Sequence, residues 1–457
     1  MGNQEQIQEN KMGIEPIGKL LVTMSTPMMI SMMVQALYNI VDSIFVAMLS
    51  EDALTAVSMA FPLQSLMIAF GVGTGVGVNA LVSRYLGAKR FKHANSVVAN
   101  GIRLTLITAV CFAVLILAVC RPFFEVQSDD ATIVSYGTTY MSIVGVLGIG
   151  MFGQTMFEKI LQATGKTFFS MITQIVGAVT NIIMDPILIF GLGPFPKMGV
   201  AGAAVATIFG QTLGTGLAIY FNLNFNKEIR ISFKEFPMDT GTIKNIYGIG
   251  IPSIFMQAVG SVMTFGLNKI LISFSSTAVA VFGVYFKLQS FTFMPVFGLN
   301  NGLVPLVSYN LGATKPDRIN EAIRLGLISS VAIMVICLIA FQTIPTQLLG
   351  LFSASEQMLT IGVPALRIIS THFLFAGISV ICIGLFQALG HAHFSLIVSI
   401  CRQLGVLLPA AYLLSRLGNI DYVWWAFPIA EVTSMIMCLI FVRYAMNKEV
   451  KPLYEAV

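Results

Sequence analysis

Charged residues are scarce in this chain of 457 residues, of which only 10% are Asp, Glu, Lys or Arg. Hydrophobic residues make up 56%, and the mean hydropathy is +0.84. A water-soluble domain of this length needs far more polar surface, so the composition excludes a soluble globular protein. It predicts a polytopic membrane protein, and no stretch between the apolar runs is large enough to fold as a soluble domain.

The sequence also lacks the patterns of several other classes. Its formal net charge is only +5, and the basic residues lie in short loops, which excludes the extended basic face of a nucleic-acid-binding protein. The six cysteines lie inside apolar runs without a C-x-x-C pair, so they predict buried thiols. Residues 1–15 have no apolar core followed by a cleavage site, so we expect a short tail there and no signal peptide.

Twelve apolar runs are long enough to cross a bilayer, which takes about 20 residues in a helix. They predict an all-α polytopic membrane protein with 12 transmembrane helices. The predicted spans lie at 17–47, 54–82, 94–120, 133–157, 168–192 and 199–222 in the first half, and at 246–273, 279–309, 322–344, 358–388, 394–415 and 423–446 in the second.

Basic residues concentrate on one side of the predicted membrane. The connections after even-numbered spans and between the two halves collect them, whereas the opposite side holds only Arg121, Lys197 and Arg416. Cytoplasmic loops carry the excess of Lys and Arg, so both chain ends are predicted to be cytoplasmic. The residues on that side include Arg84, Lys89, Arg90, Lys92, Lys166, Lys227, Arg230, Lys234, Lys244, Lys315, Arg318, Lys448 and Lys451.

The chain is a tandem repeat with a constant offset of 225 residues, at which Pro27 matches Pro252 and Gly165 matches Gly390. Six spans per copy is an even number, so both copies enter the membrane in the same direction. They are predicted to form two six-helix lobes related by a pseudo-two-fold axis along the membrane normal. The predicted organisation is a cytoplasmic N-terminal tail at 1–16, a first lobe at 17–222, a lobe linker at 223–243, a second lobe at 244–447 and a C-terminal tail at 448–457.

Two carboxylates lie inside predicted spans of the first lobe, Asp42 in span one and Asp185 in span five. An ionisable side chain in a hydrocarbon-spanning helix is costly and usually marks an inward-facing site that handles ions or substrate. Asn181 shares a helix face with Asp185. Pro186 has no amide hydrogen for the carbonyl of Ile182, so a free oxygen is expected beside Asp185.

Helix geometry places these groups at similar depth. A rise of about 1.5 Å per residue puts Asp42 and Asp185 roughly 37 and 26 Å from the cytoplasmic ends of their spans, and Thr207 about 12 Å from the outer end of span six. With Asn181, they can hold a hard monovalent cation such as Na⁺ through oxygen or share a proton, and no other metal site is expected. A structural hydrogen-bond network is the alternative. The repeat offset pairs Asp42, Asn181 and Asp185 with Leu267, Val406 and Ala410, so these polar residues belong to the first lobe alone.

Other polar residues in the spans are candidates for a substrate cavity or for gating, as is Pro27 in span one. Gln35, Tyr38 and Asn39 recur with Asp42 at helical spacing. Two lysines, Lys269 and Lys287, lie in spans seven and eight, which contain no acid. They either line a second-lobe cavity or extend toward a membrane face.

Five further acidic and basic residues have simpler interpretations. Glu158 and Lys159, near the end of span four, are predicted to be interfacial. Arg367, Arg402 and Glu431 are predicted to pair with each other in the second lobe.

These features resemble the multidrug and toxic compound extrusion family, or MATE transporters, over nearly the whole chain. The bacterial branch like DinF or MepA is the most similar, because spans seven, eight and ten lack the acids that NorM-like members carry in the second lobe. The resemblance rests on Pro27 and Asp42 in span one, Leu-Gly-Ala after spans two and eight, Gln-Ala-x-Gly after spans four and ten, Asn181-x-x-x-Asp185-Pro186, and Gly199-Val-Ala-Gly-Ala-Ala-Val-Ala-Thr207.

The resemblance implies an exporter in the bacterial cytoplasmic membrane. In it, entry of Na⁺ or H⁺ drives efflux of amphipathic, mostly cationic organic compounds by alternating access. It implies that Asp42, Asn181, Asp185 and Thr207 form the coupling-cation site, and that span one can bend near Pro27. A monomer without a cofactor or a nucleic-acid partner is expected.

Two other functions stay open. A flippase for lipid-linked oligosaccharides or another lipid precursor could use Lys269, Lys287 and Arg367 on a pyrophosphate. A membrane enzyme is disfavoured, because no motif brings a nucleophile, a base and an orienting group together.

Overall fold

The computed structural model describes residues 10–352 and 354–455, and no strand occurs within them, which confirms the all-α prediction. Residues 1–9 and 456–457 of the predicted tails lie outside the described residues. The helices, with π-helical turns written η, are α1 (Lys11–Ile14), α2 (Ile17–Ala47), α3 (Glu51–Gly87), α4 (Phe91–Gln127), α5 (Ala131–Val146), α6 (Ile149–Ala163), α7 (Thr167–Phe190), α8 (Val200–Phe225), α9 (Thr240–Leu271), α10 (Ser276–Gly312), α11 (Pro316–Thr343), α12 (Pro345–Gly350), α13 (Glu356–Ser370), α14 (Phe373–Ala388), α15 (Ala392–Ile400), η1 (Cys401–Leu407), α16 (Leu408–Ser415), α17 (Ile420–Trp424), α18 (Ala426–Ala445), η2 (Met446–Val450) and α19 (Lys451–Glu455).

Twelve apolar spans are present when each bent pair of helices is taken as one, as predicted: 10 continuous spans and 2 broken ones in the described part of the chain. The broken spans are α5 with α6, bent by 45°, and α13 with α14, bent by 51°. The sequence predicted each as a single span and did not locate the break within it. The breaks fall at residues 147–148 and 371–372, within one residue of the same position in the repeat. At the second break, the Thr371 hydroxyl donates to the carbonyl of Ile368 at 2.7 Å and so competes with the helix backbone.

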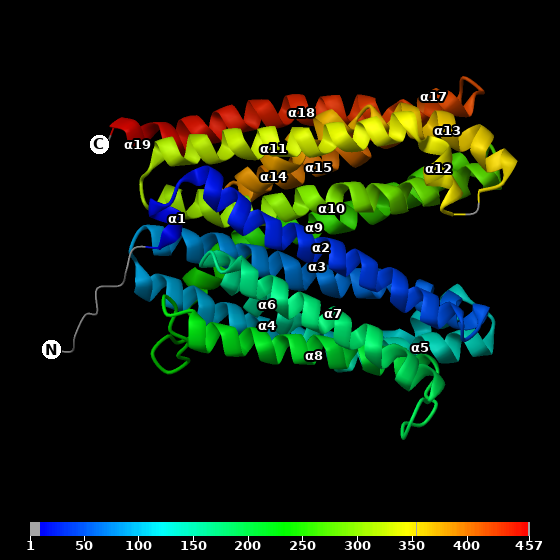
Figure 1. Ribbon diagram of the computed structural model, residues 1–457, viewed down its shortest axis with the longest axis horizontal. Helices are drawn as coiled ribbons and strands as arrows, with labels where there is room; N and C mark the ends of the chain where they lie inside the picture. Colours follow the sequence, from blue (N-terminus) through cyan, green and yellow to red (C-terminus); the bar gives the residue numbers. More distant parts are fainter. Residues whose placement is uncertain (1–9, 353, 456–457) are drawn as a thin grey trace.

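Two lobes account for the spans. The first consists of α2–α8 and the second of α9–α18, and residues 226–239 connect them. Across the lobes, α2 packs against α10 and α3 packs against α9 and α10. Figure 1 shows α1 and α19 together at one end of the molecule, which we call the α1 end, while the outer portions of α2 and α10 diverge toward the opposite end.

The lobes approach most closely near the α1 end, at two equivalent glycines. A Cβ atom on Gly87 of α3 would collide with the carbonyl oxygen of Tyr309, and a Cβ atom on Gly312 of α10 would collide with that of Arg84. Each pair is the other shifted by the repeat offset, so the contact is reciprocal, as a two-fold axis between the lobes requires. The helices can cross at this distance because neither glycine carries a side chain.

Helix α1 also connects the two lobes. The Asn10 amide donates to the carbonyl of Thr164 at 3.1 Å and to the carboxylate of Glu228 at 2.6 Å. From the second lobe, Arg318 donates to the carbonyls of Met12 at 2.9 Å and of Glu15 at 2.7 Å. Burial raises the pKa of Glu228, which lies in the segment between the lobes. The sequence predicted a tail here, because these partners are distant in the chain.

We expect Gly87→Ala and Gly312→Ala each to destabilise the protein by about 1–3 kcal/mol, because the added methyl group forces the crossing helices apart. The control is Gly283→Ala in α10, where a Cβ atom meets nothing within 4 Å. There alanine should be neutral or stabilising, because it is the better helix former. Thermal unfolding of the purified variants in detergent measures the difference. Equal midpoints for Gly87→Ala and Gly283→Ala would show that the crossing is not close-packed.

Candidate functional site

The two first-lobe carboxylates predicted from the sequence meet in the structure. Asp42 near the end of α2 and Asp185 near the end of α7 lie within hydrogen-bonding reach of each other. Asp185 is fully buried, and the Oδ1 atom of Asp42 is buried without a hydrogen-bond partner among the described residues. Two carboxyl groups this close cannot both stay ionised without a compensating cation.

An amide and a hydroxyl complete the polar cluster. In the amide orientation that satisfies both of its ends, Asn181 donates to Asp185 Oδ2 at 3.0 Å and accepts from the Thr207 hydroxyl at 3.2 Å. Asn181 lies one turn before Asp185 on α7, and Thr207 projects from the facing helix α8. Both side chains are buried. The structure therefore brings together the four residues that the sequence proposed as a cation site.

The backbone of α7 also contributes to this geometry. Pro186 lies inside the helix, so the carbonyl of Ile182 has no amide hydrogen to accept one turn later. The predicted free oxygen is therefore on the same helical turn as Asp185.

Two tyrosines lie beside the carboxyl pair, and a glutamine forms a hydrogen bond to one of them. Tyr38 of α2 and Tyr140 of α5 lie close enough for electrostatic interaction with Asp42 and Asp185. The Gln64 amide of α3 donates to the Tyr140 hydroxyl at 3.1 Å. Sequence reasoning selected Tyr38 but missed the other two. Tyr140 lies in an apolar run without a pattern. Gln64 matches Gln289 at the repeat offset, within a repeated Leu-Gln-Ser block that marks the repeat and not a site.

The remaining predicted cavity residues are spread along both lobes. Pro27 is buried in α2, Gln35 is half-buried and Asn39 is exposed. Both second-lobe lysines are exposed; Lys269 is at the end of α9, and Lys287 has its Nζ atom 5.8 Å from the ring centre of Phe352. No hydrogen bond or ion pair of these five residues with the carboxyl pair is found among the described residues. Their roles in a cavity or in gating stay predictions.

Two predictions about the other charged residues need correction. Lys159 is not interfacial: it is buried, and its Nζ atom donates to Gln162 at 2.9 Å. Glu158 is half-buried and accepts hydrogen bonds inside the first lobe. Their hydrogen-bond partners lie inside the protein, which their position near the end of a predicted span does not reveal.

In the second lobe, the predicted pairing is confirmed in part. Arg402 lies 3.3 Å from Glu431, on η1 and α18. Arg367 is exposed, and among the described residues it forms no ion pair. The predicted pairing of the three residues was therefore wrong for Arg367.

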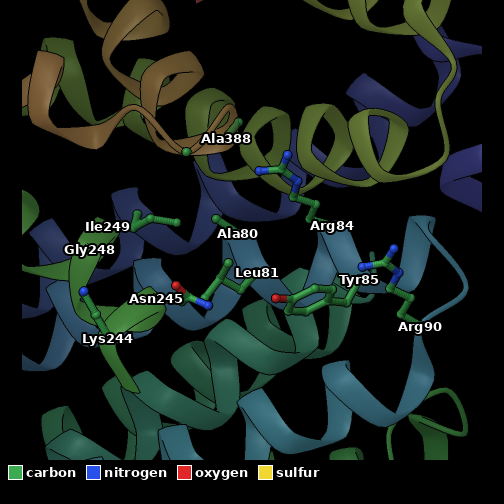
Figure 2. A pocket seen from close by; sticks show the side chains of 11 residues that line it. Ala80, Leu81, Arg84, Tyr85, Arg90, Lys244, Asn245, Gly248, Ile249 and Ala388 are labelled. Atoms are coloured by element: carbon green, nitrogen blue, oxygen red, sulfur yellow. The ribbon is translucent and has the colours of Figure 1, made fainter. Parts of the chain in front are cut away.

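A basic pocket of about 600 Å³ lies near the α1 end between the lobes. Arg84 is 3.6 Å from Glu449, whereas Arg90 and Lys244 form no ion pair with any described residue. The pocket offers cationic groups to an anion, at the opposite end of the helices from the carboxyl pair. Figure 2 shows Lys244, Asn245 and Gly248 of α9 on one side and Tyr85 and Arg90 on the other, with Ala388 across from them.

The described residues contain no group of three or more His, Cys, Asp or Glu side chains that could hold a metal ion, and all six cysteines are free thiols. The cluster of Asp42, Asn181, Asp185 and Thr207 offers only oxygen ligands and carries at most two negative charges. Its chemistry suits a proton or a hard monovalent cation.

Comparison with known proteins places this geometry in a family. The sequence model of the MatE family matches residues 27–187 and, a second time, residues 252–413. The multidrug export protein MepA of Staphylococcus haemolyticus is 28% identical over 434 residues, covering 94% of each chain. MepA of Staphylococcus aureus is 26% identical over 432 residues, covering 93% of this chain and 94% of that protein. A FAD transporter of Shewanella oneidensis is 26% identical over 430 residues with the same coverage.

Solved structures share the fold. A multidrug resistance MATE family transporter in an outward-facing conformation has a TM-score of 0.92 at 24% identity, covering 99% of this chain and 100% of that one. A transporter of the MOP superfamily from Pyrococcus furiosus has a TM-score of 0.90 at 24% identity, covering 97% and 99%. At this identity, the likeness establishes the two-lobe fold. Because the two matched segments of the family model cover more than half of the sequence, the chain belongs to the MatE family of multidrug and toxic compound extrusion transporters.

Proposed function

We propose that this protein is a multidrug efflux antiporter of the bacterial cytoplasmic membrane, in which inward movement of Na⁺ or H⁺ drives export of amphipathic, mostly cationic compounds. The observation that carries the proposal is the carboxyl pair of Asp42 and Asp185 with Asn181 and Thr207, which exists in one lobe only. The names of the MepA relatives, which are multidrug export proteins, support export of drugs.

The proposed cycle follows from where the lobes touch. Their close contacts lie near the α1 end, which loop charge predicts to be cytoplasmic, and the carboxyl pair lies toward the opposite end. This form therefore corresponds to an outward-open state, in which a cation from outside can reach Asp42 and Asp185. Cation binding relieves the repulsion between the two carboxylates, and it favours release of substrate and return to the inward-open state by rocking of the lobes.

Helix α2 provides apolar surface for a substrate next to this site. It packs against α7 in its own lobe and against α10 in the other, so it lies where the lobes meet. Its large apolar side chains remain exposed and can contact an amphipathic compound, and the flexible thioether of methionine adapts to different ligand shapes. These side chains are Ile30, Met33, Leu37, Ile40 and Ile44.

The energy available from one cation is sufficient for useful export. Moving one charge through about 100 mV provides roughly 2.3 kcal/mol, which sustains a substrate gradient of about 50-fold. One cation per cycle at this site can therefore drive export against a moderate gradient.

A second candidate is export of an organic anion. The FAD transporter among the relatives and the basic pocket with Arg90 and Lys244 favour it. Efflux of flavin adenine dinucleotide by a protein that ignores organic cations would support this function, and binding of lipid-linked precursors would instead support a lipid flippase.

We expect Asp42→Asn and Asp185→Asn each to reduce cation-driven efflux of a fluorescent organic cation by at least about tenfold, because the amide cannot compensate a bound cation. Reconstituted vesicles with an imposed ion gradient measure this rate. The control is Asp52→Asn, an exposed carboxylate in the first turn of α3 in the same lobe, which should transport normally. Undiminished efflux by both site variants would refute the assignment.

Thr207→Val tests the weaker ligand, because valine keeps the shape of threonine but removes the hydroxyl that bonds to Asn181. We expect the concentration of coupling ion for half-maximal efflux to rise by about 5–10-fold, the effect of losing one hydrogen bond, with little change in the maximal rate. Thr212→Val, an exposed position on the same helix, is the control. An unchanged ion dependence would remove Thr207 from the site.

A further inference from the structure

A further first-lobe carboxylate, Glu158 on α6, has no role in the site described above. Its Oε1 atom accepts from the Gln154 amide at 2.9 Å and from the Thr173 hydroxyl at 2.9 Å. With its amide oriented to give both ends a partner, Gln174 donates to both carboxylate oxygens at 3.2 Å. Three neutral side chains from α6 and α7 thus surround one carboxylate.

This network can accommodate Glu158 with or without a proton. The Thr173 hydroxyl has one hydrogen and two acceptors within reach, Glu158 Oε1 at 2.9 Å and the carbonyl of Ser170 at 2.7 Å. When Glu158 is ionised, Thr173 donates to the carboxylate. When Glu158 is protonated, it can donate to the Thr173 oxygen while Thr173 donates to Ser170. Only hydrogen atoms need to move, and the oxygen positions stay in place.

A continuous polar face of α7 connects this network with the carboxyl pair. Ser170, Thr173, Gly177, Asn181 and Asp185 follow each other at intervals of three or four residues and are all buried. They share one face of the helix. From Thr173 to Asp185 the rise is about 18 Å along α7.

Amide side chains fill the middle of this distance. A Cβ atom on Gly177 would lie 3.4 Å from the Gln154 amide nitrogen, and one on Gly214 would lie 2.9 Å from it, so Gln154 occupies the space between α7 and α8. Gln211, one turn beyond Thr207 on α8, has a buried Oε1 atom without a partner among the described residues. An unpartnered buried oxygen between two ionisable sites is a position for a bridging water molecule.

The second lobe lacks this network at the equivalent positions, although it keeps the scaffold. The hydroxyls of Ser83 and its repeat partner Ser308 make the same contact, to the carbonyls of Ala163 at 2.9 Å and of Ala388 at 3.1 Å. A network needed only for packing of the lobe should also appear in both copies. Instead, Gln154, Glu158, Thr173 and Gln174 correspond to Ser379, Ile383, Val398 and Ser399.

Lys159, which follows Glu158 in the chain, forms a hydrogen bond to the other lobe. Lys159 donates from its Nζ atom to Gln162 at 2.9 Å and to Asn301 of α10 at 3.1 Å. The latter bond crosses between the lobes, and opening the α1 end would break it. Protonation of Glu158 would leave the Lys159 charge without its neighbouring counter-charge, so it can change the stability of this contact.

Lys159 is the charged group that interacts electrostatically with Glu158. The charged residues on the helices packed around α6 are as follows. Among the helices packed against α6, α7 carries only Asp185 and α8 carries no charged residue. Arg103 of α4 donates to the carbonyl of Phe233, and the charged residues of α3 lie near its two ends. On α10, Lys287 is stacked on Phe352.

From this geometry we infer that the coupling ion is a proton and that Glu158 is its second binding site. This inference rests on the proposed antiport. The Glu158 carboxylate accepts one proton that leaves the Asp42–Asp185 pair, becomes a neutral acid that donates to Thr173, and releases the proton to water at the α1 end. The carboxyl pair returns to its deprotonated state in the same step, so charge and protons balance.

The test compares two kinds of transport by the full-length protein in vesicles. Efflux of a fluorescent organic cation against its gradient, driven by a pH gradient, requires net proton movement, whereas exchange of labelled for unlabelled substrate at equal pH does not. For Glu158→Gln we expect pH-driven efflux to fall at least about tenfold and exchange to stay within about twofold of the original protein. Glu158→Asp, which can still bind a proton, should recover part of the coupled rate.

The outcomes separate this inference from the proposed function. Coupled efflux that survives in Glu158→Gln but is lost in Asp185→Asn would overturn the role of Glu158 and leave the antiporter intact. Coupled efflux that survives in both would overturn both proposals. Efflux driven by a Na⁺ gradient and not by a pH gradient would overturn the proton inference alone.

Thr173→Val keeps the test decisive if Glu158→Gln does not fold. It retains the carboxylate but removes the hydroxyl that exchanges its hydrogen between Glu158 and Ser170. We expect pH-driven efflux to fall at least about threefold, with exchange unchanged, because the protonated acid loses its acceptor. Equal coupled rates for Thr173→Val and the original protein would contradict the inference.

Discussion

The cost of holding two carboxyl groups away from water is the constraint on which the rest of this structure depends. Asp42 and Asp185 lie within reach of each other toward the ends of two apolar helices, where hydrocarbon replaces solvent. Asn181 and Thr207 satisfy part of their hydrogen-bonding capacity, and a monovalent cation or a shared proton supplies the remaining charge compensation. A site whose stability changes with its ion can bias the arrangement of the lobes around it, which is the requirement for coupling.

The internal repeat separates scaffold from function. Both copies contribute the same six-span arrangement, breaks at 147–148 and 371–372 that lie within one residue of the same repeat position, and the reciprocal crossing at Gly87 and Gly312. Only the first copy carries the polar face of α7, whereas the second has the Arg402 and Glu431 ion pair in its interior. The two lobes can therefore move as similar bodies while one of them alone responds to the cation.

Much of the fold and of the candidate site could be predicted from the sequence. Apolar runs define spans because each must cross the hydrocarbon, and helical spacing with residue counts placed Asp42 and Asp185 at similar depth. The convergence of Tyr140 and Gln64 could not be predicted, since it depends on which helix faces meet after packing. The burial of Lys159 was missed for a related reason: one of its partners, Asn301, lies in the other lobe.

Ion release on substrate binding tests the central claim most directly, because the account requires substrate and cation to oppose each other through Asp42 and Asp185. Purified protein in weakly buffered detergent solution is mixed with a saturating organic cation, while a pH indicator and a Na⁺ electrode record what is released. The account predicts that the original protein releases ions and that the double variant Asp42→Asn, Asp185→Asn binds the compound without release. Equal release by both proteins, or binding by the original protein with none, would contradict it.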